Sequence, residues 1–235
     1  MASPFILSEE IMSVSLAKQI TQLSAANKPT VFVIALNSQR LLQRCQTEFE
    51  QAPYKALPKT PVIYVLPEAT HNRSGATVWL PEGKKQLRIE PHLGVVFGQD
   101  TSRVSVENAL YTVAGYVPVA LYSLPNGSYY RPDIEGRCQD GFCVLGQTVM
   151  KSAVTNPAEV MVNIALNGAI KKSYVHLDMK HSVAELISFL SQFIAFKAGD
   201  ILLTGTEDMP LLASAGDEVS VDFVQIGSVS NTIAE

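Results

Sequence analysis

Alternating apolar and polar positions predict a long strand between residues 87 and 98. Side chains of a strand point alternately to its two faces, so Ile89 and Val95 share one face and can enter a core. Glu90 and His92 share the other face, two residues apart. An acid and an imidazole at this spacing form half of a divalent metal site. The alternative is a polar strand face exposed to water.

Similar patterns predict the other elements. Runs of β-branched residues at 30–36 and 61–66 indicate buried strands, and the dipeptide at 167–168, Asn-Gly, indicates a hairpin turn. Ser182, with Glu185 three residues later, predicts a capped helix. The remaining expected elements are helices over 8–26, 38–51 and 105–114, strands over 76–80, 116–122, 201–204, 218–224 and 228–233, and an irregular segment over 129–146. Because strands and helices do not alternate regularly, the predicted fold class is α+β with a mainly antiparallel or mixed sheet.

Length and composition suit one large domain, or one domain with a small N-terminal addition, in the cytoplasm. Of 235 residues, 47% are hydrophobic and 17% charged, which allows a sizeable core and leaves apolar surface for self-association. The net charge of -4 provides no basic surface for nucleic acid, and no apolar run is long enough to predict a membrane span. The three cysteines contain no CxxC motif, and the N-terminus lacks signal-peptide features. Both observations favour cytoplasmic localisation with reduced thiols.

Four segments together resemble the fumarylacetoacetate hydrolase superfamily. The C-terminal one is the most specific, because a capped helix, an Ala-Gly-Asp turn and a Leu-Thr-Gly-Thr strand end follow in fixed order. The segments are EPHLGVVFG (90–98), VSVENALYTVAGY (104–116), QDGFCVLG (139–146), and the run 182–206 with AGDEVSVDF (215–223). Within the superfamily, residues 35–39, 51–62 and 129–132 are most similar to the isomerase/decarboxylase branch of 4-hydroxyphenylacetate (homoprotocatechuate) catabolism, and to the N-terminal of its two similar halves.

The resemblance implies rolled, mixed β-sheets with a few edge helices over residues 29–235, divided into a leading segment, 29–60, and a core, 61–235. Residues 1–28 are then a helical extension. It also implies an isomerase or decarboxylase (a lyase) of aromatic catabolism. Its substrates would be of the 2-hydroxyhepta-2,4-diene-1,7-dioate or 5-oxopent-3-ene-1,2,5-tricarboxylate type, processed through a metal-stabilised enolate. The implied assembly is a homodimer or a pairing with a similar catalytic subunit. The alternative is a non-catalytic structural half that pairs with an active paralogue.

The resemblance further implies Mg²⁺ or Mn²⁺ bound by three carboxylates. Glu90 matches the first, His92 stands at the second, and Leu121 replaces the expected aspartate. An imidazole can ligate a metal in place of a carboxylate, but leucine cannot. We therefore expect weak or absent metal binding by this chain.

The other candidate site residues come from the same resemblance to the superfamily. Arg137 stands where the family has a lysine, and Leu66 replaces a second lysine. The candidates for catalysis are Arg137, Asp140 and Thr206, and those for substrate binding are Arg131, Arg137, Thr204, Gly205 and Thr206. A second interpretation gives Asp140, Asp178 and the run 204–206 a structural role in capping and turns.

Overall fold

The computed structural model describes residues 28–130, 133–176, 178–207 and 211–235. The expected helix over 8–26 and Arg131 lie outside the described residues, as does the proposed extension 1–28 apart from Lys28. In the part of the chain that is described, no helix is long and apolar enough to cross a membrane.

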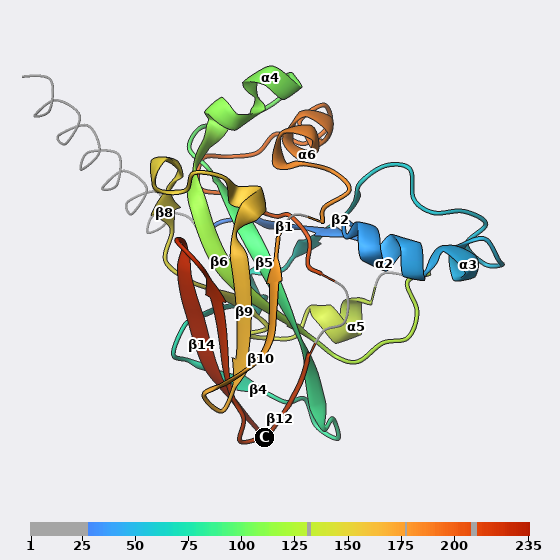
Figure 1. The fold of residues 1–235 in the computed structure, drawn as a ribbon, viewed down its shortest axis with the longest axis vertical. Helices are drawn as coiled ribbons and strands as arrows, with labels where there is room; N and C mark the ends of the chain where they lie inside the picture. The colour runs from blue at the N-terminus through green and yellow to red at the C-terminus, as the bar shows by residue number, and fades with distance from the viewer. Residues whose placement is uncertain (1–27, 131–132, 177, 208–210) are drawn as a thin grey trace, which may run out of the picture.

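Two β-sheets form the body of the molecule (Figure 1). The larger sheet has the order β2-β1-β11-β5-β6-β7-β3, with β12 paired to β5 and β8 to β6, and the smaller has the order β10-β9-β13-β14-β4. The strands are β1 (Val31–Ala35), β2 (Val62–Leu66), β3 (His71–Arg73), β4 (Thr77–Trp79), β5 (Gln86–Phe97), β6 (Val113–Ser123), β7 (Cys143–Leu145), β8 (Val149–Met150), β9 (Met161–Leu166), β10 (Ala169–Val175), β11 (Ile201–Leu203), β12 (Leu211–Ser214), β13 (Glu218–Phe223) and β14 (Gly227–Ala234). Parallel pairs (β1–β11, β3–β7 and β4–β14) occur among antiparallel ones, which confirms the predicted mixed α+β fold.

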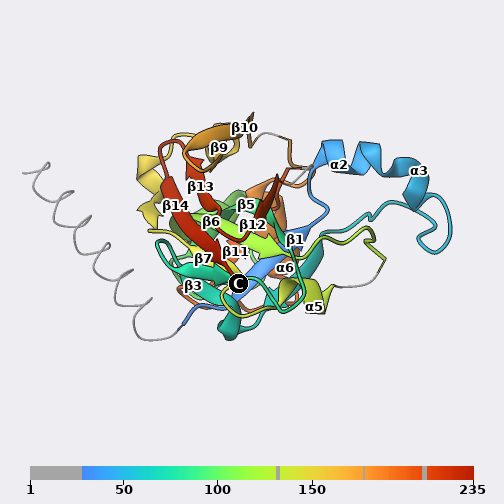
Figure 2. The same cartoon turned by 90° about the horizontal axis from the view of Figure 1, so that it is seen from below.

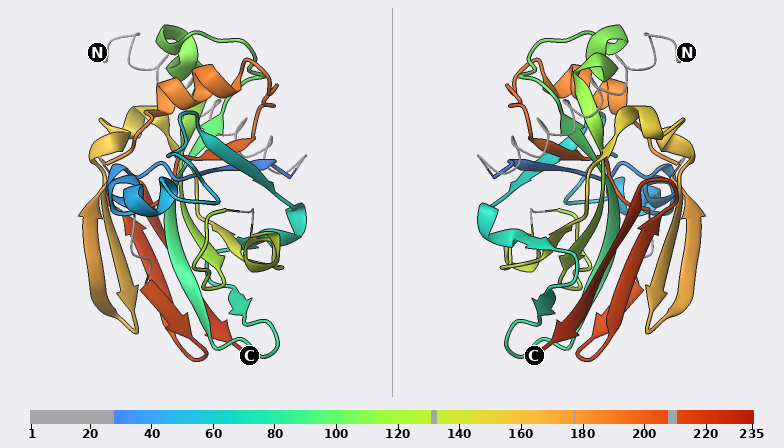
Figure 3. Two further views of the ribbon diagram at one scale, coloured as in Figure 1. Left: turned by 90° about the vertical axis from the view of Figure 1, so that its right-hand side faces the viewer. Right: turned by 90° about the vertical axis from the view of Figure 1, so that its left-hand side faces the viewer.

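Short helices lie at the edges of these sheets. They are α2 (Gln39–Arg44), α3 (Gln46–Phe49), α4 (Val106–Ala109), α5 (Ile134–Arg137) and α6 (Val183–Leu190), with 3-10 turns η1 (Glu68–Thr70), η2 (Leu110–Thr112), η3 (Lys151–Ala153) and η4 (Pro157–Glu159). Helices α2 and α3 project from one side of the body (Figure 2), whereas α4 and α6 pack together at one end (Figure 3).

The main core lies between the two sheets, because one face of β5 and β6 packs against the inner face of the smaller sheet. Ile89 and Val95 of β5 and Tyr122 of β6 belong to this core and are fully buried, as the alternation along β5 predicts. Glu90 and His92 point to the opposite face and are only 3% and 2% exposed. The interpretation of this face as exposed to water is therefore wrong. Helix α5, which comes later in the chain, covers part of this face through Arg137.

Several local predictions are confirmed and others are wrong. The hairpin β9–β10 forms over Asn167-Gly168, and Ser182 and Glu185 make both hydrogen bonds of a capping box at α6. The expected helix over 38–51 breaks at Cys45 into α2 and α3. The helix over 105–114 ends early, because its last residues start β6 and Gly115 lies within that strand. A β-carbon at Gly115 would lie 2.1 Å from the Val149 carbonyl oxygen of β8, so close pairing of strands, rather than a helix end, requires this glycine.

Candidate active site

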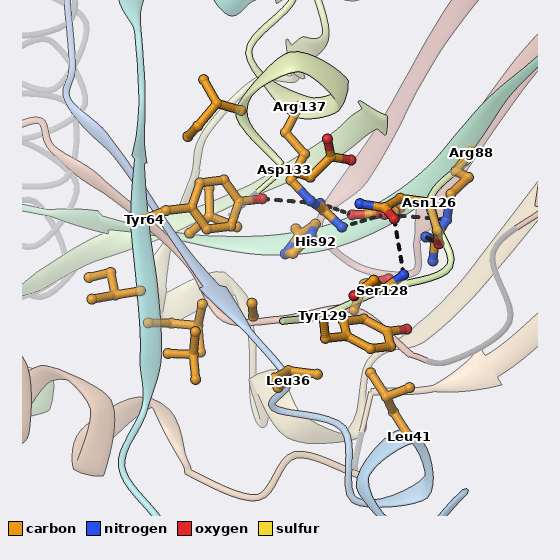
Figure 4. Close-up of a pocket in the computed structure, with 18 of the residues that line it drawn as sticks. Leu36, Leu41, Tyr64, Arg88, His92, Asn126, Ser128, Tyr129, Asp133 and Arg137 are labelled. Atoms are coloured by element: carbon orange, nitrogen blue, oxygen red, sulfur yellow. Dashed lines mark hydrogen bonds and ion pairs between the residues drawn. The ribbon is translucent and has the colours of Figure 1, made fainter. Parts of the chain in front are cut away.

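A cavity of about 260 Å³ opens on the face of the larger sheet opposite the main core (Figure 4). Its walls come from β1, β2, β5 and α5, from the loop that leads to α5, and from Thr206 and Glu207 after β11. These segments are far apart in sequence and meet only through the sheet order. The irregular segment over 129–146 supplies part of the wall, as a long loop in a small domain often does when it has a functional role.

Strand β5 provides three polar side chains to this cavity: Arg88, Glu90 and His92. They are spaced two residues apart and therefore share one face of the strand. Sequence reasoning selected Glu90 and His92 but missed Arg88. The same alternation would have found it, since Arg88 precedes Glu90 by two positions.

The Glu90 carboxylate is held by three side chains. The Arg137 guanidinium donates from Nη1 to Oε2 at 2.7 Å and from Nη2 to Oε1 at 3.1 Å, and the Ser123 hydroxyl donates to Oε1 at 2.8 Å. Nε of Arg88 lies 3.7 Å from Oε1. Burial opposes ionisation of Glu90, but the adjacent Arg137 charge and its hydrogen bonds prevail and lower the pKa of this carboxyl. Glu90 is therefore an anion with its oxygens already bound by protein donors.

Local structure explains why Arg137 reaches Glu90. Asp133 starts the single turn of α5 by accepting the backbone N–H of Gly136 at 3.0 Å. The Gly136 carbonyl in turn accepts the N–H of Leu124 at 2.8 Å, which ties α5 to the end of β6. Arg137, at the end of α5, also donates to the Tyr64 hydroxyl at 3.2 Å. The guanidinium is thus fixed by contacts from β2 and β5.

The residues at the expected metal position do not fit Mg²⁺ or Mn²⁺. Leu121 lies directly opposite Glu90 in the β5–β6 register, is fully buried, and packs in an apolar cluster with Leu66 and Cys143. Both ring nitrogens of His92 are buried without a hydrogen-bond partner. At the matched positions on this face of β5, they are the only atoms besides the Glu90 oxygens that could ligate a metal ion. Across the described ranges, no group of three His, Cys, Asp or Glu residues is placed to hold an ion. Hard cations of this kind take about six oxygen ligands, and this set provides one carboxylate that is already paired with arginine.

The structure brings some of the other candidate residues to the cavity and not others. Thr206 lines it, whereas the Thr204 hydroxyl is buried behind it, donating to the Leu93 carbonyl at 3.1 Å. Gly205 between them has a φ of +115°, which glycine adopts without strain. Asp140 is exposed and does not line the cavity. Asp178 accepts the backbone N–H of Arg40 at 3.1 Å, a structural contact at the start of α2.

Glu207 is a second carboxylate that sequence reasoning did not select. It lines the cavity, and its side chain is 8% exposed. Arg40 lies 2.7 Å and Lys172 3.1 Å from its oxygens. The sequence signal for it was its place directly after the Thr-Gly-Thr run.

A buried histidine beside the cavity predicts how stability depends on pH. His176 is 3% exposed, and its Nε2 lies 3.0 Å from the Thr204 hydroxyl. Burial lowers the pKa of His176 to about 4, whereas an unfolded histidine titrates near 6.5. The unfolded chain therefore binds more protons between these values, and we expect the free energy of unfolding to fall as pH drops from about 6.5 to about 4. The free energy of unfolding of wild type and of His176→Gln is measured by urea denaturation at several pH values in this range. Plotted against pH, it should rise less steeply for His176→Gln, by up to about 1.4 kcal/mol per pH unit. An unchanged slope would contradict this prediction.

Comparison with known proteins agrees with this fold. The model of the fumarylacetoacetate (FAA) hydrolase C-terminal domain matches residues 30–234. The chain belongs to the fumarylacetoacetate hydrolase family. Its FAA hydrolase relatives include the 4-hydroxyphenylacetate degradation bifunctional isomerase/decarboxylase of Escherichia coli, which is 36% identical over 83% of this chain and 44% of the relative. The chain thus spans less than half the length of this relative.

Solved structures of other proteins share the fold. The 5-carboxymethyl-2-hydroxymuconate delta-isomerase of Mycobacterium smegmatis superposes with a TM-score of 0.72 at 21% identity, over 87% of this chain and 78% of that one. A fumarylpyruvate hydrolase from Pseudomonas aeruginosa, solved in complex with Mn²⁺ and pyruvate, has a TM-score of 0.74 at 19% identity, over 87% and 89% of the two chains. Metal use therefore occurs in this FAA hydrolase fold, while the present chain lacks a fitting set of donors at the matched positions.

Proposed function

We propose that this chain is a chain or subunit of an isomerase/decarboxylase of 4-hydroxyphenylacetate (homoprotocatechuate) catabolism. The proposed substrates are 2-hydroxyhepta-2,4-diene-1,7-dioate and 5-oxopent-3-ene-1,2,5-tricarboxylate, or acids of the same type. The observation that carries the proposal is the 36% identity to the bifunctional enzyme over 83% of this chain. The cavity agrees with it, because two guanidiniums adjoin an otherwise largely apolar wall.

A specific observation favours a second candidate function for the isolated polypeptide. Leu121 and Leu66 fill the positions of an implied ligand and an implied lysine with packed hydrocarbon, and Arg137 occupies the oxygens of Glu90. A chain with these replacements suits the role of a non-catalytic half that pairs with a metal-holding paralogue. Under this alternative, the chain provides an interface that stabilises the assembly, and the partner performs the chemistry.

One assay separates the two candidates. The purified chain is incubated with 2-hydroxyhepta-2,4-diene-1,7-dioate, alone and with a metal-holding half of a bifunctional relative, and the loss of the conjugated-diene absorbance is followed. Turnover by the chain alone supports the enzyme, and turnover only in the mixture, above that of the added half, supports the non-catalytic half. If the chain alone shows no turnover, and the mixture turns over no faster than the added half by itself, both candidates are contradicted.

We also propose that the chain works as a homodimer or pairs with a similar catalytic subunit. Large apolar side chains on α4, η2, α6 and the turn after α6 remain exposed at one end of the molecule. Tyr111 of η2 is 78% exposed, and Phe193 of the turn is 63% exposed. Exposed apolar groups at this density are typical of an interaction surface. Sedimentation that gives a monomer at tens of micromolar, with and without the added half, would contradict this assembly.

A further inference from the structure

The two arginines of the cavity have N–H groups that the protein does not use. A guanidinium carries five N–H donors. Those of Arg137 make two bonds to Glu90 and one to Tyr64, and in the described part of the chain its remaining donors have no acceptor. Arg88 donates from Nη1 to the Asn126 carbonyl at 3.3 Å, and its buried Nε lies 3.7 Å from Glu90 Oε1. Within the described residues, its other Nη N–H groups have no acceptor. Figure 4 shows the two side chains reaching toward the same region from opposite sides.

Charge at this end of the cavity favours an anion. Arg88 and Arg137 flank a single carboxylate, that of Glu90, so one positive charge is left over at that point. The other carboxylates that line the cavity are already engaged within the protein. Glu207 is paired with two cations. Asp133 keeps its negative charge, and one of its oxygens accepts a backbone N–H at the start of α5.

The rest of the cavity suits a short hydrocarbon chain. Val33 of β1, Ile63 of β2 and Ile134 of α5 line it, and Tyr129 lies on the side opposite Arg137 (Figure 4). At about 260 Å³ it is slightly smaller than the typical pocket for a drug-sized ligand, about 300–1,000 Å³. Its dimensions and wall therefore fit a small elongated acid.

We propose that Arg88 and Arg137 together bind one carboxylate of a small elongated dicarboxylic acid without a divalent cation. The Arg137 guanidinium then stands beside Glu90 where the family resemblance implies an ion, and it provides the positive charge as part of the polypeptide. Its planar fork suits a carboxylate because two parallel N–H···O bonds can form. The length of the acid in this inference rests on the proposed function. The mode of binding rests on the geometry of the cavity.

The test uses heptanedioate, a saturated seven-carbon dicarboxylate that cannot isomerise, titrated into the full chain in excess EDTA and followed by calorimetry. We expect the wild-type chain to bind it. Arg88→Gln should weaken binding about tenfold or more, because hydrogen bonds to a charged group are lost while the Glu90–Arg137 pair stays intact. Arg103→Gln is the matched control, since Arg103 is exposed and outside the cavity, and its affinity should equal that of wild type.

Two results would overturn the inference: binding that appears only when Mn²⁺ replaces EDTA, or equal affinity of wild type and Arg88→Gln. If Arg88→Gln does not fold, Arg88→Lys keeps the charge but loses the fork, and its affinity should also fall. Failure of the proposed function is distinguishable, because the diene assay measures turnover and heptanedioate measures binding alone. Arginine-dependent binding without turnover in any mixture counts against the proposed function and leaves this inference standing.

Discussion

Glu90→Gln is expected to lower the free energy of unfolding by about 3–5 kcal/mol, the usual effect of breaking a buried ion pair. Glu90 pairs with Arg137. The Glu90 side chain is 4% exposed and that of Arg137 21%, and Arg137 Nη1 lies 2.7 Å from Glu90 Oε2. Without the carboxylate charge, Arg137 remains beside Tyr64 with no counter-ion, and Arg88 loses its nearest anion. For a domain of this size the corresponding fall in melting temperature is roughly 6–20 °C. Urea denaturation followed by circular dichroism measures the loss.

The matched control is Asp100→Asn, the same acid-to-amide change in an exposed pair. Asp100 and Lys197 are also 2.7 Å apart, but their side chains are 64% and 69% exposed, so solvent screens the pair and we expect no measurable change. A second control, Glu90→Gln with Arg137→Met, removes both buried charges and should recover much of the lost stability. Equal losses in Glu90→Gln and Asp100→Asn would show that the buried pair has no special role.

Restoring a metal site is expected to require three substitutions rather than two. The sequence suggests His92→Glu with Leu121→Asp, since both residues lie on strands that fix their side-chain directions. Glu90 and residue 121 are direct cross-strand neighbours, which places their side chains on one face and within reach of each other. However, Arg137 would pair with the new carboxylates as it does with Glu90, so Mn²⁺ should change the stability of the double variant little. Adding Arg137→Met removes this internal cation and leaves three carboxylates for the ion.

The measurement is thermal unfolding with Mn²⁺ and with EDTA. In EDTA the triple variant should melt well below wild type, because unpaired carboxylates in a buried site are costly. At a Mn²⁺ concentration of about 100 times the dissociation constant, binding to the folded state contributes about 2.7 kcal/mol, or roughly 5–11 °C. Wild type should show no such increase. An equal increase in wild type and the triple variant, or none in the triple variant, would contradict the assignment of these strand positions to the ion site.

Much of the local structure follows from short-range patterns alone. Strict alternation put Glu90 and His92 on one face of β5, and the Asn167-Gly168 turn and the Ser182–Glu185 capping box formed as expected. The resemblance to the FAA hydrolase family likewise required only the order of motifs along the chain, and the family match confirms it. These features depend on residues a few positions apart, where backbone geometry relates sequence spacing directly to direction in space.

Tertiary structure alone decided what the candidate site contains. Arg137 lies 47 residues from Glu90 in a segment without a clear pattern, and no periodicity indicates which carboxylate such an arginine will meet. Burial of the Glu90 face depends on segments that return over it, and the apolar cluster around Leu121 depends on the pairing of β6 with β5 and β7. The sequence by itself determined which faces of the strands carry acids, bases and hydrocarbon. Which of these faces meet depended on sheet order and register, because contacts between distant segments arise only when the whole chain packs.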